Sequence, residues 1–335
     1  MIAKPGFFQC FRNKLIGLFC GLIISLIVPS IGLGEETQNQ SGNPEKPETP
    51  QQAETETAPL PNQAYGAYQR GQYLTAFKLA LPLANLGDPA AQTLIAELYE
   101  KGLGIARNKK EATAWYEIAA NAGNREAQFS FAIKLLEGKY IKEDRKRAMK
   151  LMQSAADAGH SVAMYNYAQQ LISNNPGSKG FKAAFPYLEK SASAGVVDAY
   201  YALSQVYGSG MGLKSPDAAK AKTWLLKAAH GGVDTAQIEL ALLLANGKDG
   251  TKDEKSARNW FQRAALTGNV IAQNRLAHML ARGMGGPVNA VQSAKWYILA
   301  RRAGHTDFRL DDFLDSLSRE DRAKALDAAN HWRPR

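Results

Sequence analysis

The chain has 335 residues and a formal net charge of +10 at pH 7, and its two cysteines, Cys10 and Cys20, both lie near the start. Everything after residue 20 therefore lacks a thiol, which excludes a disulfide, a thiolate nucleophile and a thiolate metal site there. The cationic excess favours contact with anionic surfaces such as lipid headgroups, acidic polysaccharide or an acidic face of a protein.

Residues 1–34 have the pattern of an export signal. Basic residues and no acidic ones precede an apolar stretch without charge at residues 15–33, and this order is typical of a signal peptide. Cleavage after Gly32 or Gly34 suits the small residues there. A retained membrane anchor is the alternative, because the stretch approaches the roughly 20 residues that cross a bilayer. Both alternatives predict a periplasmic location, either soluble after cleavage or tethered to the inner membrane by residues 15–33.

Residues 35–61 are rich in Pro, Glu, Gln and Thr, and they contain six glutamates against the single cation Lys46. They have no aromatic or β-branched aliphatic residue, so they offer too little apolar surface to form a core. We expect a disordered acidic tether that spaces the folded part from the membrane. A binding role of its own is the alternative.

Residues 62–304 contain a glycine that recurs at intervals of 36 or 37 residues. A period of about 20–50 residues is typical of solenoids, in which one small structural unit is stacked repeatedly. The glycines, near which the successive units end, are Gly87, Gly123, Gly159, Gly195, Gly232, Gly268 and Gly304.

Each unit contains the patterns of two helices. The first, helix A, carries small or apolar residues four, eight, nine and twelve positions after the glycine, as in Ala91, Ile95, Ala96 and Tyr99. This spacing places them on one face of an α-helix. A second glycine, replaced once by Asn174, fits the left-handed conformation that often ends a helix. The second helix, helix B, follows a short loop and ends near an Ala-x-x-Gly sequence.

The unit resembles a known family. The residues that carry the resemblance are Gly102-Leu-Gly104 in the loop, Lys110-Glu-Ala-Thr-Ala-Trp-Tyr116 in helix B and Ala119-Ala-Asn-Ala-Gly123 at its end. They are similar to the Sel-1-like repeat, a relative of the tetratricopeptide repeat, over roughly residues 63–304. The resemblance implies an all-α fold, a right-handed α-solenoid of about seven antiparallel helix pairs, and an adaptor role in protein complexes. It carries over no catalytic residue.

Residues 305–335 depart from the repeat pattern. One amphipathic helix is expected from Thr306, and Ser318-Arg-Glu-Asp321 resembles a capping box that begins another. A solenoid needs an atypical last unit with a polar outer face. We therefore expect a helical C-terminal cap whose aromatic residues belong to the core.

Two sets of residues are candidates for partner binding. Helix-A side chains outside the core stripe would line a concave wall, and they are Gln92, Glu97, Gln128, Lys134, Gln170, Tyr200, Gln205, Gln237, Glu239, Gln273 and Arg275. The glutamines five positions after the repeat glycine have an alternative role, which is to bond backbone groups of the loops. A basic docking patch, with a solvated helix face as the alternative, is indicated by Lys139, Lys142, Arg145, Lys146, Arg147 and Lys150.

No set of residues indicates catalysis, a cofactor or a metal. The five histidines include no pair with the spacing of a zinc helix. We therefore predict a scaffold or adaptor that binds another protein of the bacterial cell envelope. We also expect a regulatory role and weak contact with anionic lipid or polysaccharide, but no role with nucleic acid. The alternative is a periplasmic module that binds peptidoglycan or acidic polysaccharide, suggested by the charge and by Trp115, Trp224, Trp260 and Trp296, although their shared helix-B position favours the core.

Overall fold

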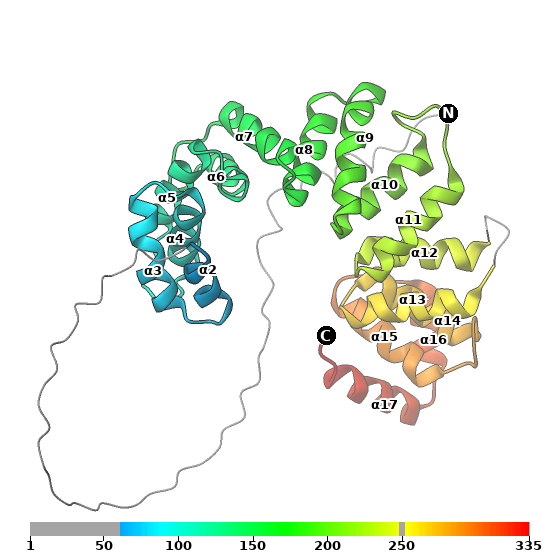
Figure 1. Ribbon diagram of the computed structural model, residues 1–335. Helices are drawn as coiled ribbons and strands as arrows, with labels where there is room; N and C mark the ends of the chain where they lie inside the picture. Colours follow the sequence, from blue (N-terminus) through cyan, green and yellow to red (C-terminus); the bar gives the residue numbers. More distant parts are fainter. Residues whose placement is uncertain (1–60, 248–251, 335) are drawn as a thin grey trace, which may run out of the picture. The chain divides into compact units, whose positions relative to one another are not determined.

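A computed structural model describes residues 61–247 and 252–334 of the chain. The predicted leader and nearly all of the predicted acidic tether lie outside these residues. In the part that is described, the regular structure is entirely α-helical, and the helices follow one another along the chain (Figure 1). The all-α fold expected from the repeat pattern is thus confirmed.

Helices A and B alternate in seven pairs within the described residues. Helix A of the successive pairs is α2 (Pro61–Gln69), α4 (Pro89–Lys101), α6 (Arg125–Glu137), α8 (Ser161–Asn174), α10 (Val197–Ser209), α12 (Asp234–Asn246) and α14 (Val270–Arg282). Helix B is α3 (Tyr73–Asn85), α5 (Lys109–Asn121), α7 (Arg145–Asp157), α9 (Ser178–Ser193), α11 (Ala218–His230), α13 (Glu254–Leu266) and α15 (Ala290–Arg302).

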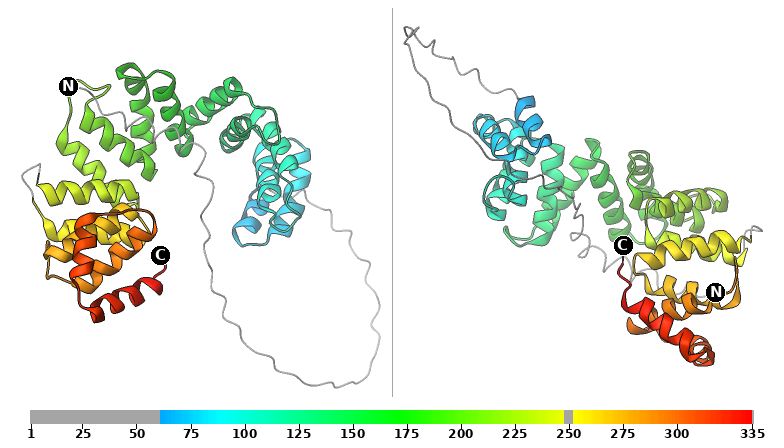
Figure 2. Two further views of the ribbon diagram at one scale, coloured as in Figure 1. Left: turned by 180° about the vertical axis from the view of Figure 1, so that it is seen from behind. Right: turned by 90° about the horizontal axis from the view of Figure 1, so that it is seen from below.

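The helices pack in chain order, as expected for a solenoid. Helix A contacts helix B of its own pair, and helix B then contacts helix A of the next pair, for example α5 against α6 (Figure 2). Each pair therefore buries its apolar faces against its neighbours. Loops from A to B lie at one edge of the stack, and turns from B to A lie at the other.

Local sequence sets the helix ends. Asp88 caps α4 by accepting a hydrogen bond from the Ala91 N–H at 2.6 Å, and Asn124 caps α6 in the same way. All seven repeat glycines have positive φ between 87° and 94°. A glycine with positive φ also ends helix A wherever the sequence predicts one, as Gly102 does with φ 72°.

The prediction for Asn174 is wrong. Asn174 is the last residue of α8 rather than a left-handed cap, and the next residue, Asn175, has φ −130°. The chain there continues through Pro176 and begins α9 early, at Ser178. This unit thus ends helix A without the left-handed turn, because no glycine stands at that position.

The small residues of the repeat form the contact surfaces between helices. Ala91, Ile95 and Ala96 of α4 are buried, as are their counterparts in the later helix-A segments. Alanine lets neighbouring helices approach closely, and larger residues such as Phe131 and Leu203, both 0% exposed, fill the space between them. The stripe predicted from the spacing is therefore the core.

The second glycine of the A-to-B loop packs against the preceding helix B. At Gly104, with φ 70°, an added Cβ would lie 2.5 Å from the backbone nitrogen of Leu74, in the first turn of α3. Gly212 approaches α9 equally closely at Phe181 and Lys182, and Gly285 approaches the first turn of α13. A side chain at these positions would push the loop away from its neighbour.

The chain ends in two further helices, α16 (Phe308–Ser316) and α17 (Arg319–Asn330), which pack on α14 and α15. Ser318 caps α17, since its Oγ accepts a hydrogen bond from the Asp321 N–H at 3.0 Å. Trp332 packs on Trp296 with ring centroids 5.9 Å apart. Phe308 contradicts the expectation of a wholly internal aromatic set, because it is 70% exposed at the start of α16.

Candidate interaction surfaces

Three of the glutamines proposed for the helix-A wall lie inside the fold. Gln92, Gln237 and Gln273 are buried. The Nε2 of each donates a hydrogen bond of 3.1–3.4 Å to the carbonyl oxygen eight residues earlier, at the end of the previous helix B. Gln128 is half-buried and makes the same contact to Ala120 at 3.5 Å. These side chains satisfy backbone carbonyls of the B-to-A turn, and burial of Gln92, Gln237 and Gln273 corrects the assignment of these three to the partner-binding wall.

Charged residues of the wall connect neighbouring pairs. Glu97 accepts a hydrogen bond from the hydroxyl of Tyr68 on α2 at 2.7 Å and forms an ion pair with Lys101. Lys134 on α6 lies 2.9 Å from the carboxylate of Glu100 on α4. Burial and then the hydrogen bond to Glu97 raise the pKa of Tyr68. The Tyr68–Glu97 hydrogen bond and the Lys134–Glu100 ion pair thus cross from one repeat to the next.

In the later repeats, too, side chains of the wall contact neighbouring side chains. Gln205 donates a hydrogen bond to the carboxylate of Glu239 at 2.9 Å, and Tyr200 stacks on Trp224 with centroids 5.6 Å apart. Gln170 is half-buried, and Arg275 is the one member of the eleven that is exposed. What the helix-A wall offers to a partner is therefore a half-buried polar surface whose groups already contact one another.

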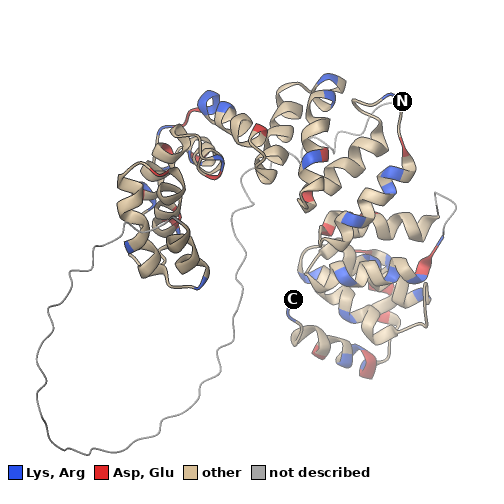
Figure 3. Ribbon diagram, viewed as in Figure 1, with Lys and Arg blue, Asp and Glu red and all other residues tan. Residues whose placement is uncertain are grey.

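The predicted basic patch divides into paired and unpaired residues. Arg147 contacts Glu117 at 2.7 Å and Asn121 at 3.1 Å, and Arg145 contacts Glu143 at 2.5 Å. The other four members are exposed and have no carboxylate within 4.0 Å among the described residues, and they are Lys139, Lys142, Lys146 and Lys150. Figure 3 shows the basic residues gathered at the start of α7.

The structure adds residues that the sequence search missed. An open depression of about 460 Å³ lies where the loop before α7 meets the start of α5, and it is lined by Arg107, Asn108, Lys109, Lys110 and Tyr140. Arg107 to Lys110 lie one repeat before the predicted patch. A search for stretches dense in Lys and Arg does not connect these residues with the predicted patch. A comparison of positions one repeat apart would connect them.

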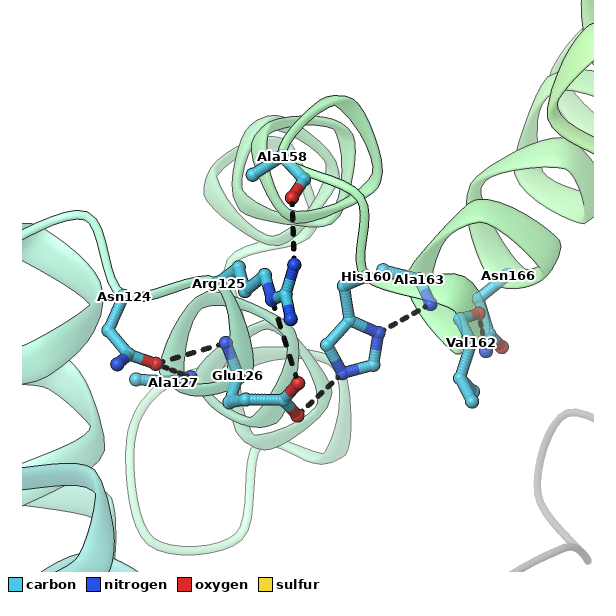
Figure 4. Close-up of polar contacts among 9 residues, drawn as sticks. All are labelled: Asn124, Arg125, Glu126, Ala127, Ala158, His160, Val162, Ala163 and Asn166. Carbon is cyan, nitrogen blue, oxygen red and sulfur yellow. Dashed lines mark hydrogen bonds and ion pairs between the residues drawn. The ribbon is translucent and has the colours of Figure 1, made fainter. Parts of the chain in front are cut away.

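His160 is buried and caps α8 (Figure 4). Its Nδ1 accepts a hydrogen bond from the Ala163 N–H at 3.0 Å, and its Nε2 lies 2.9 Å from the carboxylate of Glu126 on α6. An accepting Nδ1 requires the ring proton on Nε2, which then donates to Glu126. The ring also packs on Phe129, with centroids 4.5 Å apart. This histidine joins two repeats rather than binding a ligand.

His278 holds the C-terminal cap. Its Nε2 lies 2.7 Å from the carboxylate of Asp307, which also accepts a hydrogen bond from Asn274 at 3.3 Å. Burial alone would raise the pKa of Asp307, but these hydrogen bonds outweigh it and lower the pKa to about 2. In residues 61–247 and 252–334, no three His, Cys, Asp or Glu side chains are grouped so that they could hold a metal ion.

The helix-B tryptophans are packing residues. Trp260 and Trp296 are buried, while Trp115 and Trp224 are half-buried. Cations lie over three of the rings, with Lys227 at 4.3 Å from the centroid of Trp224, Arg263 at 5.1 Å from Trp260 and Lys295 at 4.6 Å from Trp296. Neither buried ring is an open platform on which a sugar could stack.

The fold and these surfaces define a class of protein, the all-α solenoids built from stacked antiparallel helix pairs. Within this class, the chain belongs to the Sel1 repeat family. The six segments that match the Sel1 repeat are residues 89–124, 126–160, 161–196, 197–233, 234–269 and 270–305. Sel1 repeats are generally modules for protein–protein interaction, and the repeat scaffold is generally non-catalytic.

Solved structures support the assignment. A Sel1 repeat protein from Oxalobacter formigenes is 26% identical with a TM-score of 0.62, and the match covers 73% of this chain and all of that one. A protective antigen from uropathogenic Escherichia coli, which displays an SLR fold, is 22% identical with a TM-score of 0.54 over 81% of this chain and 68% of its own. The latter shows the fold alone. No curated protein matches the chain.

The described helices give one further finding about membranes. None of α2 to α17 is both long and apolar enough to span a bilayer. The apolar stretch at residues 15–33 lies outside the described residues, so the choice between signal peptide and anchor remains a prediction from sequence.

Proposed function

We propose that this chain is a non-catalytic scaffold that binds another protein in the bacterial cell envelope. The observation that carries the proposal is the uninterrupted stack of seven helix pairs, whose helix-A side presents polar side chains from every repeat. A solenoid of this kind offers an extended surface that suits a protein partner. The export pattern of residues 1–34 supports the envelope location.

Binding of peptidoglycan or acidic polysaccharide has less support than binding of a protein. The tryptophans that suggested it are half-buried or buried between helices, and Trp296 is only 4% exposed. Charge alone then remains in favour of that alternative, and charge suits an acidic protein surface equally well.

The proposal is tested by site-specific crosslinking in intact cells. A photo-crosslinking amino acid replaces Arg275, which is exposed on helix A, and in a matched variant it replaces Gln262, which is exposed on helix B of the preceding pair. We expect a discrete crosslinked protein, identified by mass spectrometry, from the helix-A position and little from the helix-B position. The absence of any crosslinked protein from helix-A positions in several repeats would count against a scaffold role.

The location is tested separately by the mass of the mature chain. Cleavage after Gly32 or Gly34 gives a protein without residues 15–33, whereas a retained anchor gives the full-length mass in the membrane fraction. Recovery of the chain from the cytoplasm, in either form, would contradict the envelope part of the proposal.

A further inference from the structure

Two consecutive A-to-B loops, together with the helix-B turns that follow them, contain more Lys and Arg residues than any other two consecutive A-to-B loops of the repeats. Residues 102–112 and 138–148 contain eight Lys and Arg residues against three Asp and Glu. The same segments of later repeats differ. Residues 174–184 have two Lys and no acidic residue, and residues 210–220 have two Lys against one Asp. Residues 247–257 have three charges of each sign, and residues 283–293 have none. The positive charge of the A-to-B loops is therefore highest at residues 138–148 and falls to zero over the last two loops.

Few of these cations are neutralised by the protein itself. Arg145 and Arg147 have carboxylate partners, and Lys109 lies 3.9 Å from Glu100. The remaining cations on the two loops and on the first turns of α7 have no carboxylate within 4.0 Å among the described residues. We call these residues, together with Tyr140, the basic loop surface, and they are Arg107, Lys110, Lys139, Lys142, Lys146 and Lys150.

The acidic residues of the same segments are largely occupied. Glu143 pairs with Arg145, and Asp144 caps α7 by accepting a hydrogen bond from the Arg147 N–H at 2.9 Å. Only Glu111 remains as an exposed carboxylate without a contact of this kind. An anionic ligand would thus meet an excess of cations without a carboxylate partner, although Arg107 donates a hydrogen bond to the Glu100 carbonyl oxygen at 2.9 Å.

A sequence change explains the depression in this surface. Tyr140 stands two residues after Gly138, where other loops have the second glycine, such as Gly104 two residues after Gly102. That glycine packs directly on the first turn of the preceding helix B. A tyrosine cannot approach so closely, and a depression of about 460 Å³ is left over the start of α5, between Tyr140, Arg107 and Lys110. The Tyr140 side chain is 38% exposed.

We propose that the basic loop surface binds an acidic segment of the partner protein. Its carboxylates would pair with the free lysines, and one of its side chains would enter the depression beside the Tyr140 ring. The inference rests on the proposed scaffold role. A short peptide segment is favoured because the excess of positive charge falls to zero over the last two A-to-B loops, whereas a long polysaccharide or a membrane plane would use a charge that continues along the whole edge of the stack. The depression provides a place for a single side chain.

Fluorescence anisotropy with a labelled poly-Glu peptide tests the proposal directly. The test variant carries Lys110→Gln, Lys142→Gln, Lys146→Gln and Lys150→Gln. The control variant loses the same charge at four exposed lysines elsewhere, through Lys78→Gln, Lys179→Gln, Lys190→Gln and Lys214→Gln. We expect salt-sensitive binding to the natural chain, at least about tenfold weaker binding to the test variant and less than about threefold weakening in the control.

A second variant, Tyr140→Gly, examines the depression without a change in charge. It restores the Gly-x-Gly sequence that three other A-to-B loops have. We expect several-fold weaker binding of the same peptide with the same dependence on salt. Because the site is exposed, the helical content of all variants should match that of the natural chain by circular dichroism. Unchanged binding by Tyr140→Gly would remove the depression from the proposal.

Several results would overturn the inference. One is no binding of poly-Glu to the natural chain, and another is an equal loss in both quadruple variants. Polygalacturonate and phosphatidylglycerol vesicles serve as competing probes, and stronger binding of either through the same four lysines would assign the surface to a polysaccharide or a membrane. If crosslinking from helix A captures the same partner with the natural chain and with the test variant, the scaffold role stands and the acidic-segment inference fails.

Discussion

Single residues decide how one repeat is joined to the next. His160 stands where Asp88, Asn124 and Asn269 cap the helix-A segments of other repeats, and it makes the same bond to the backbone through Nδ1. It also provides a ring that packs on Phe129. Capping and packing can therefore be separated by substitution.

We predict that His160→Asn is less destabilised than His160→Ala by about 1 kcal/mol, because the amide oxygen of asparagine replaces the cap acceptor and alanine does not. Both variants lose the ring contact with Phe129. The measurement is urea unfolding at neutral pH, followed by circular dichroism. Equal losses in the two variants would mean that the ring contact, rather than the cap, stabilises this end of α8.

Two glycines with similar backbone conformations should respond differently to the same substitution. Gly104 has φ 70° and Gly123 has φ 88°, but an added Cβ meets the backbone of α3 at Gly104 and nothing within 4 Å at Gly123. We predict a loss of about 1 kcal/mol for Gly123→Ala from the left-handed backbone alone, and about 3 kcal/mol for Gly104→Ala, which adds the steric clash. Thermal unfolding of both variants measures the difference. Similar losses would show that the loop can move away from α3 at little cost.

At the scale of helices, attachment of the cap to the last pair depends on pH. The pKa of Asp307 is lowered from its ordinary value of 3.8 to about 2 in the folded chain. A carboxylate whose pKa is lower in the folded chain than in the unfolded chain stabilises the fold at pH values above its unfolded-state pKa. This stabilisation is lost as the pH falls toward the folded-state pKa of about 2. The shift corresponds to a stabilisation on the order of 2 kcal/mol at neutral pH.

We therefore predict that Asp307→Asn lowers the stability of the chain at pH 6, and that the gap from the natural chain shrinks between about pH 4 and pH 2. Urea unfolding of both proteins across this range is the measurement. Asp315→Asn serves as a control at an exposed carboxylate of α16, and we expect a much smaller effect at each pH. A gap that stays constant down to pH 2 would show that the Asp307 carboxylate is not responsible.

The helices can be predicted well from the sequence because the same glycine and alanine positions recur in each repeat. The spacing of Gly87, Gly123 and their successors gives the number of pairs, and the alanine positions give the core face. It cannot give the contacts of Lys134, Gln205 or Arg147, because their partners lie about one repeat away on another helix. Those contacts depend on how one pair is rotated against the next, which the periodicity leaves open. The pairing of Arg147 with Glu117 was missed for this reason, whereas Arg145 pairs with Glu143 only two residues before it.

At the scale of the whole solenoid, stability is local, because each pair contacts only its neighbours. The last pair lacks a following repeat and is covered by α16 and α17 instead. Trp296 and Tyr297 of α15 are 4% and 1% exposed, and Trp332 and Asp311 of the cap contact them. The cap thus substitutes for an eighth pair.

Deletion of residues 305–335 should expose this face of α15. We predict faster amide hydrogen exchange in α14 and α15 and unchanged exchange in α4 to α6, together with a tendency to associate, because apolar surface is uncovered at one end only. Hydrogen exchange by mass spectrometry resolves the helices, and Leu326→Ala, an exposed site on α17, is the matched control with no expected change. If exchange rose equally in every helix, the stack would unfold as one cooperative body, and the independence of distant repeats would be wrong.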